Sequence, residues 1–206
     1  MVSTRRALAV LALGAVAIGA VRAQDLKNDS ETVRRAIHVC ASCHGDGGQS
    51  KKAGIPSLAG QMRQYTIAQL RDFRSSTRAE PGTLAYMWGV SALLDDATIE
   101  GLADFYAAQP PVRGKPGSAA LVAAGRRLYE KGAPERGIRA CSSCHGDAAE
   151  GASGFPRLAG QRAEYVLAQL KVFGTTLRPH GVLMKKETKG MTPAEMKAVA
   201  AYVHSL

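Results

Sequence analysis

The chain has 206 residues with 46% hydrophobic and 5% aromatic residues, and its formal net charge is +10. The length allows either one large domain or two small ones. The positive charge does not indicate nucleic acid as a partner, because the basic residues lack interleaved aromatic residues and the chain begins with an export signal.

That signal covers residues 1–23, with a basic start at Arg5 and Arg6, an apolar run over 7–21 and a small-residue cleavage site ending at Ala23. The apolar run of about 15 residues is shorter than the roughly 20 that span a bilayer, and no other apolar run comes close. We therefore expect an exported, periplasmic product with no transmembrane segment after cleavage. An uncleaved segment acting as an anchor is the alternative, and peripheral contact with a membrane stays open.

The charge beyond the signal is divided unevenly. Residues 24–110 hold 9 basic and 10 acidic residues, whereas residues 111–206 hold 15 basic and 7 acidic residues. Such an asymmetry can steer the encounter with an acidic surface. Scattered, solvated lysines and arginines are the ordinary alternative.

The second half of the chain repeats the first. The matching segments are Cys40-Ala-Ser-Cys43-His44-Gly-Asp with Cys141-Ser-Ser-Cys144-His145-Gly-Asp, Pro56-x-Leu-Ala-Gly-Gln61 with Pro156-x-Leu-Ala-Gly-Gln161, and the series Tyr65, Gln69, Leu70 and Phe73 with Tyr165, Gln169, Leu170 and Phe173. Such a duplication predicts two like domains. We assign residues 24–109 to the first and 118–206 to the second, with the Pro- and Gly-rich segment 110–117 as a semi-rigid linker.

Each half is predicted to be helical, taken in chain order. A helix near 30–41, capped by Asp29 or Ser30, leads into the first motif, and a helix over about 118–131 precedes the second. Roughly helical apolar spacing predicts a helix from Tyr65 to Phe73 and from Tyr165 to Phe173. The closing helices begin at Asp95 and at Thr192-Pro193-Ala194-Glu195, a capping box with proline at the first helical position. No stretch shows the sustained alternation of a strand, so the fold class is all-α.

The chemistry is carried by two Cys-x-x-Cys-His motifs, which contain all four cysteines. On a helical turn this spacing lets two thiols add to the vinyl groups of one haem while the adjoining histidine faces the iron. We expect Cys40 and Cys43 to hold one haem and Cys141 and Cys144 the other, with His44 and His145 as iron ligands.

These cysteines have three alternative uses: a redox pair, a zinc site and disulfides. A thioredoxin-like redox pair needs neither the histidine nor a second copy, and the strands of that fold are missing. One zinc site built from both Cys-x-x-Cys pairs leaves the matched histidines unexplained. Simple disulfides are the third alternative.

The repeat also suggests the sixth ligands. Met87 and Met184 each stand eight residues before the cap of a closing helix, and each has a methionine partner in the other half. Met62, Met191 and Met196 have no such partner and are assigned to packing. His180, four residues before Met184, is the main competitor, whereas His38 and His204 are expected at the surface or in packing.

These features resemble the class I c-type cytochromes, and their tandem arrangement is similar to the diheme cytochrome c4 family over residues 30–206. The resemblance implies two all-helical cytochrome domains with His/Met iron and two covalent haem c groups, carrying electrons toward a terminal oxidase.

The resemblance also implies that the carbonyls of Pro56 and Pro156 orient the iron-binding histidines. The alternative is that these prolines only form turns. Arg78 and Arg178 could contact haem propionates, or they could be surface arginines. The segment from Arg178 to Met184 is three residues shorter than that from Arg78 to Met87.

With both faces of each iron occupied, we expect an electron-transfer protein and no enzyme. The first hypothesis is a periplasmic shuttle between respiratory or dehydrogenase donors and a terminal oxidase, with redox proteins as weakly docking partners. The alternative is a cytochrome subunit of a periplasmic dehydrogenase, for example a flavin-dependent one that oxidises sulfide. A diheme catalyst, such as a peroxidase or a thiosulfate-oxidising enzyme, would need an open or unusual iron ligand.

Overall fold

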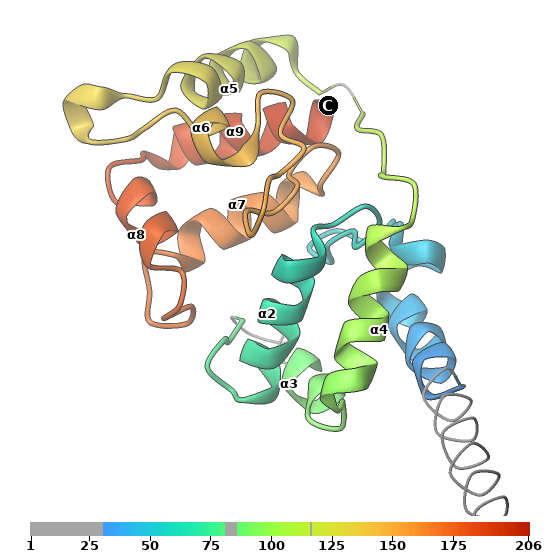
Figure 1. Cartoon of the computed structure of the whole chain (residues 1–206). Coiled ribbons are helices and arrows are strands. Elements are labelled where there is room, and N and C mark those ends of the chain that lie inside the picture. The colour runs from blue at the N-terminus through green and yellow to red at the C-terminus, as the bar shows by residue number, and fades with distance from the viewer. Residues whose placement is uncertain (1–30, 81–85, 116) are drawn as a thin grey trace, which may run out of the picture.

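The structure is a computed structural model that describes residues 31–80, 86–115 and 117–206 (Figure 1). These residues form helices joined by loops, with two isolated β-bridges and no strand among them, which confirms the all-α fold class. None of the described helices is long and apolar enough to cross a membrane. The predicted signal segment 1–23 and the predicted caps Asp29 and Ser30 lie outside the described residues.

The first half is built from one long helix, three shorter ones and a 3₁₀ turn: residues 31–44, η1 (Asp46–Gly48), α2 (Arg63–Arg74), α3 (Tyr86–Ser91) and α4 (Asp96–Ala107). The opening helix was predicted to end near residue 41, and it instead runs to residue 44. The first Cys-x-x-Cys-His motif therefore forms its last turn.

The second half follows the same order with one change. It consists of α5 (Ala119–Lys131), η3 (Pro134–Arg136), α6 (Ser142–His145), α7 (Ala163–Val172), α8 (Val182–Thr188) and α9 (Pro193–Ser205). Here a loop that contains η3 and its C-cap Gly137 separates the opening helix from the motif. The second motif consequently sits on its own short helix, α6.

The closing helices begin as the sequence predicted. The side chain of Asp95 accepts a hydrogen bond from the Thr98 backbone N–H, and Thr192 and Glu195 form a complete capping box with Pro193 in the first turn. The pKa of Glu195 falls to about 2, because the side chain of Arg136 and the backbone of Thr192 donate hydrogen bonds to its carboxylate. Both caps fix the point at which the last helix of each half starts.

The core of the second half is the crossing of α5 and α9, where Leu128 and Tyr129 pack with Val199 and Tyr202. This crossing is close because Gly125 has no side chain. A Cβ at this position would lie 2.0 Å from the carbonyl oxygen of Ala198, which belongs to the backbone of α9. A residue larger than glycine would push the two helices apart.

We therefore expect Gly125→Ala to lower the free energy of unfolding of the second half by about 1–3 kcal/mol, the usual cost of overpacking a core. Alanine normally stabilises a helix relative to glycine by roughly 1 kcal/mol. A decrease in the free energy of unfolding would therefore show that the close contact between α5 and α9 outweighs this gain. Denaturant unfolding of the haem-loaded protein measures the effect. Gly89→Ala in α3 is the control, because a Cβ there meets nothing within 4 Å, and an equal loss in both variants would contradict the contact.

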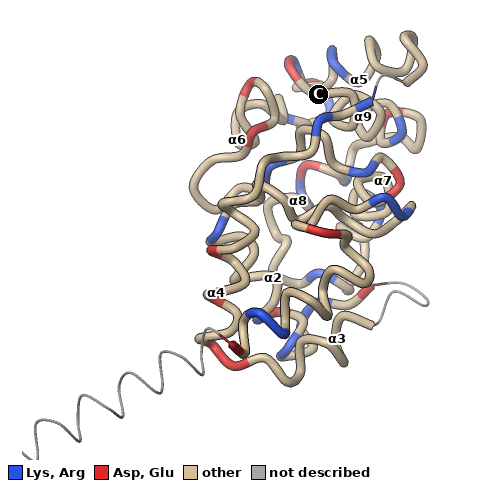
Figure 2. Tube along the Cα trace, turned by 90° about the vertical axis from the view of Figure 1, so that its right-hand side faces the viewer, with Lys and Arg blue, Asp and Glu red and all other residues tan. Residues whose placement is uncertain are grey.

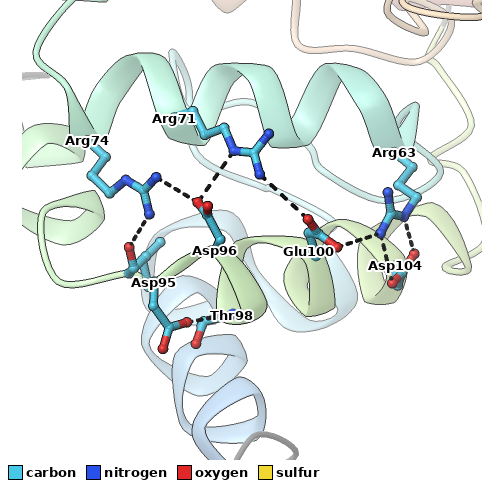
Figure 3. A network of polar contacts seen from close by, with 9 residues as sticks. Arg63, Arg71, Arg74, Asp95, Asp96, Thr98, Glu100 and Asp104 are labelled. Atoms are coloured by element: carbon cyan, nitrogen blue, oxygen red, sulfur yellow. Dashed lines mark hydrogen bonds and ion pairs between the residues drawn. The ribbon is translucent and has the colours of Figure 1, made fainter.

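The first half is also held by a ladder of ion pairs between α2 and α4, shown in Figure 3. Arg63 pairs with Asp104, Arg71 with Glu100 and Arg74 with Asp96, at N···O distances of 2.5, 3.5 and 2.7 Å. These side chains are largely solvent-exposed, so each pair contributes little. The corresponding residues of the second half are Ala163 and Lys171 in α7 and Gly174 beyond its end, so the described second half lacks this ladder.

The segment between the halves lies against the end of the chain. The backbone N–H of Gly114 donates to the carbonyl of Leu206 at 2.9 Å, and that of Lys115 to the carbonyl of His204 at 3.1 Å. Residues 114 and 115 are therefore fastened to the end of α9, and the semi-rigid linker over 110–117 stays a prediction.

Candidate functional site

Both histidines of the two motifs are buried and held in the same way. The Nδ1–H of His44 donates to the carbonyl oxygen of Pro56 at 2.8 Å, and that of His145 to Pro156 at 2.9 Å. The hydrogen bonds expected from the resemblance are therefore present. They leave Nε2 as the ring nitrogen available to a metal. Burial lowers the pKa of both imidazoles, more than the proline carbonyls raise it, which keeps the rings neutral and able to act as ligands.

All four cysteines are free in the structure. Burial raises the pKa of the Cys141 thiol to about 11 and also raises that of Cys40. A catalytic thiol pair needs the opposite shift, toward thiolate, so these two thiols do not support the redox alternative. Among the residues that the structure describes, no three His, Cys, Asp or Glu side chains come together as a metal site would require.

The two matched methionines lie on short helices that the sequence pattern did not predict. Met87 is on α3 and Met184 is on α8. Both line the same cavity as the two motifs, and so does Met191. Met191, which was assigned to packing, does pack against the core of the second half, as does Met184. It also lies in the wall of the candidate site.

The competing histidine is engaged elsewhere. His180 lies at the rim of the cavity, but its Nδ1 is 2.8 Å from Oδ1 of Asp72 in the other half, and its side chain is 65% exposed. His38 is exposed, and His204 is hydrogen-bonded to the carbonyl of Gln161. Of the methionines and histidines considered as sixth ligands, Met87 and Met184 have the matched placement in both halves.

The cavity has a volume of about 730 Å³ and is lined from both halves. Its wall includes every residue that the motifs and the repeat singled out: Cys40, Cys43, His44, Met87, Cys141, Cys144, His145 and Met184. The volume lies within the range of roughly 300–1,000 Å³ usual for small-molecule and cofactor sites. The remainder of the wall is mostly apolar, with Leu70, Leu102, Phe155, Leu170 and Val199 among its residues.

Arg78 and Arg178 also line this cavity, and their alternative assignment to the surface is wrong. They are only 4% and 8% exposed, and their guanidinium groups lie over the rings of Phe73 and Phe173 at 4.3 and 4.4 Å from the ring centroids. Although burial works against it, the neighbouring Tyr165, Tyr65 and Glu80 raise the pKa of Arg78. Two buried cations therefore stand in the wall of a mostly apolar cavity.

The halves meet through reciprocal hydrogen bonds that follow the repeat. The backbone N–H of Ser57 donates to the side-chain carbonyl of Gln161 at 2.8 Å, and Gln161 Nε2 donates back to the Ser57 carbonyl at 2.9 Å. Arg157 and Gln61 make the same pair of bonds, at 2.8 and 3.0 Å. The repeated Pro-x-Leu-Ala-Gly-Gln segment thus joins each half to the other.

The buried arginines cross the same interface. Arg78 donates to the hydroxyl of Tyr165 at 3.1 Å, and Arg178 donates to that of Tyr65 at 3.3 Å. Each arginine also bonds the glutamines of both halves, Gln69 and Gln169. In the sequence these tyrosines and glutamines stand out only because they recur at matching positions of the two halves. The recurrence of polar residues, at positions where internal packing would favour apolar ones, was the available signal of an interface between the halves.

These features fit two haem groups. Each half offers a cysteine pair, a histidine with Nε2 available and a methionine in the wall of one apolar cavity, and the buried arginines provide cations for carboxylates such as propionates. Apolar surroundings and cations near the carboxylate edge are what a haem requires for burial.

Comparisons with known proteins also indicate a haem-binding protein. The family model described as Cytochrome c matches residues 34–105 and 122–206. The chain is 39% identical over 180 residues to cytochrome c-552 of Acidithiobacillus ferridurans, covering 86% of this chain and 78% of the relative. It is 40% identical over 172 residues to a thiosulfate dehydrogenase electron acceptor of Thiomonas intermedia, covering 80% and 76%. A solved cytochrome c4 of Acidithiobacillus ferrooxidans aligns with a TM-score of 0.76 at 40% identity, covering 81% of this chain and 98% of that one.

Proposed function

The chain belongs to the cytochrome c family, and on this premise we propose that it is a periplasmic diheme carrier that takes single electrons from respiratory or dehydrogenase donors and passes them to a terminal oxidase. The single observation that supports this best is the cavity wall, because it gathers both motifs and both matched methionines. The export signal expected over residues 1–23 supports the periplasmic location.

Each half contributes two cysteines for thioether bonds, one histidine and one methionine: Cys40, Cys43, His44 and Met87 in the first, and Cys141, Cys144, His145 and Met184 in the second. Bound haem supplies an iron couple that exchanges one electron. The chain fixes the ligands, keeps water from the apolar wall and holds the histidine rings through the carbonyls of Pro56 and Pro156.

A carrier is favoured over an enzyme because each half offers both a histidine and a methionine in the cavity wall. If these side chains hold the iron of each haem, no position would be left for a substrate, whereas catalysis on a small molecule needs an open one. Electron exchange needs only that partners approach closely, and small interfaces suit partners that bind and leave quickly.

The related protein named as an electron acceptor of thiosulfate dehydrogenase suggests a class of donor. We propose a periplasmic dehydrogenase of this kind as the donor, with a subunit role in such an enzyme as the alternative. The test mixes the oxidised protein with thiosulfate, with and without a purified thiosulfate dehydrogenase, and follows reduction by absorbance. Reduction only with the dehydrogenase supports the carrier. Thiosulfate oxidation by the isolated protein would overturn it, and copurification with a stoichiometric flavoprotein would favour the subunit.

The uneven charge predicts different reduction potentials for the two haems. Residues 111–206 carry the excess of basic residues, although basic and acidic positions are interspersed along both halves (Figure 2). Positive charge near an iron favours its reduced form, so we expect the second haem to have the higher potential. A redox titration with the haems resolved measures the order, and a higher potential for the first haem would contradict it.

A further inference from the structure

The two buried arginines occupy matching positions of the repeat but differ in whether a carboxylate lies beside them. Arg78 forms an ion pair with Glu80, two residues further on. The residue that corresponds to Glu80 in the second half is His180, which is exposed and bonded to Asp72. The hydrogen bonds of Arg178 go to neutral side chains, those of Gln169, Tyr65 and Gln69. Of the two guanidinium groups, that of Arg78 is thus the one with a carboxylate beside it.

Glu80 is fixed at the cavity. Its side chain is 7% exposed and lies in the cavity wall. One carboxylate oxygen accepts from Arg78, and the other accepts from Gln169 Nε2 of the second half at 2.7 Å. These bonds hold a buried negative charge where the two halves meet.

The segment that carries Glu80 is fastened to the wall of the first half. The indole N–H of Trp88 donates to the carbonyl of Arg78, and Trp88 follows Met87 on α3. The Arg78 guanidinium lies over Phe73 of the same half. Glu80 is therefore tied to the side of the cavity that contains the proposed methionine ligand of the first haem.

Building on the two-haem function proposed above, we propose that Glu80 is the residue that sets the first haem's reduction potential below that of the second. The propionates that the two buried arginines would face are the same in both halves, so the difference that remains is the buried carboxylate of Glu80, which stands beside Arg78 and has no counterpart beside Arg178 among the described residues. A charge in a buried, poorly solvated site acts more strongly than one at the surface and is less screened by salt. The Arg178 cation then favours electron uptake by the second haem, and Glu80 cancels that effect at the first.

The other charged groups at the cavity do not remove this difference. Arg157 also lines the wall and adds positive charge on the side of the second half. Glu187 lines the wall in the second half, but its partner Arg139 is 57% exposed, so solvent screens that pair. Asp72 and His180 meet at the rim, where His180 is mostly exposed. Among the carboxylates in the described part of the cavity wall, Glu80 is the one whose charge and cationic partner are both buried.

The test is Glu80→Gln, which removes the charge while its single amide oxygen can still accept from Arg78, although it cannot also replace the oxygen that accepts from Gln169. We expect the first haem's potential to rise toward that of the second. The equilibrium constant for sharing one electron between the haems then shifts toward the first by about threefold or more. A redox titration followed by NMR, with the haem resonances assigned to each half, measures both potentials.

Two variants control the experiment. Glu80→Asp keeps the charge and is expected to keep the order and most of the gap. Glu100→Gln removes an equal charge from the exposed ladder between α2 and α4, and is expected to leave the gap unchanged. An unchanged gap in Glu80→Gln, or equal shifts in Glu80→Gln and Glu100→Gln, would overturn the assignment. Haem content of the wild-type protein is measured first, because its absence there would count against the proposed function and not against Glu80.

Discussion

Replacing Cys141 and Cys144 together by alanine is expected to give a protein that keeps one covalent haem instead of two. Thioether bonds survive denaturation, whereas a haem held only by iron ligands dissociates when the chain unfolds. The mass of the denatured variant should therefore be lower than that of the wild-type protein by one haem, beyond the loss of two sulfur atoms. This is the largest change that we expect from any substitution in the second half.

The same variant should weaken the second half alone. An apolar cavity without its occupant loses the contacts that the cofactor's surface would make with side chains such as Leu170 and Val199. Ser142→Ala is the matched control, because Ser142 stands between the same two cysteines and has no thiol, and it should keep both haems. A double variant that retains two covalent haems would show that the second motif is not an attachment site.

Met184→Ala is expected to lower the amplitude of the methionine-to-iron absorption band by about half, because one of two irons loses its sulfur ligand. The second haem's potential should fall as well, since sulfur ligation favours the reduced iron. Absorbance spectra of the oxidised protein and a redox titration measure these effects. Met87→Ala should do the same for the first haem.

The control for this experiment is Met191→Ala. Met191 also lines the cavity and packs against the core of the second half, so its removal tests for a merely structural effect. We expect it to leave the band intact. A band of full amplitude in Met184→Ala and of about half amplitude in Met191→Ala would assign the second haem's ligand to Met191 instead.

Much of the fold could be predicted because the signals were local. The capping box at Thr192 and the cap at Asp95 depend on neighbouring residues, and both are present. The bond from each motif histidine to a proline carbonyl followed from the resemblance, and it too is present. The short helices α3 and α8 were missed because six or seven residues give too little periodicity to distinguish a helix from a loop.

The interface could not be predicted from single residues. The sequence near Arg78 or Arg178 did not reveal that they are buried, because the partners that each contacts across the interface lie about 90 to 110 positions away. The same holds for Gln61 and Gln161, which bond the backbone of the opposite half. Contacts of this kind depend on how the two copies face each other, and a repeat alone does not define that arrangement.

Mass spectrometry of the denatured wild-type protein, secreted by a host that can mature c-type cytochromes, tests covalent attachment of two haems most directly. The predicted result is a coloured protein with the mass of the mature polypeptide plus two haems. A colourless product with the mass of the polypeptide alone would contradict it.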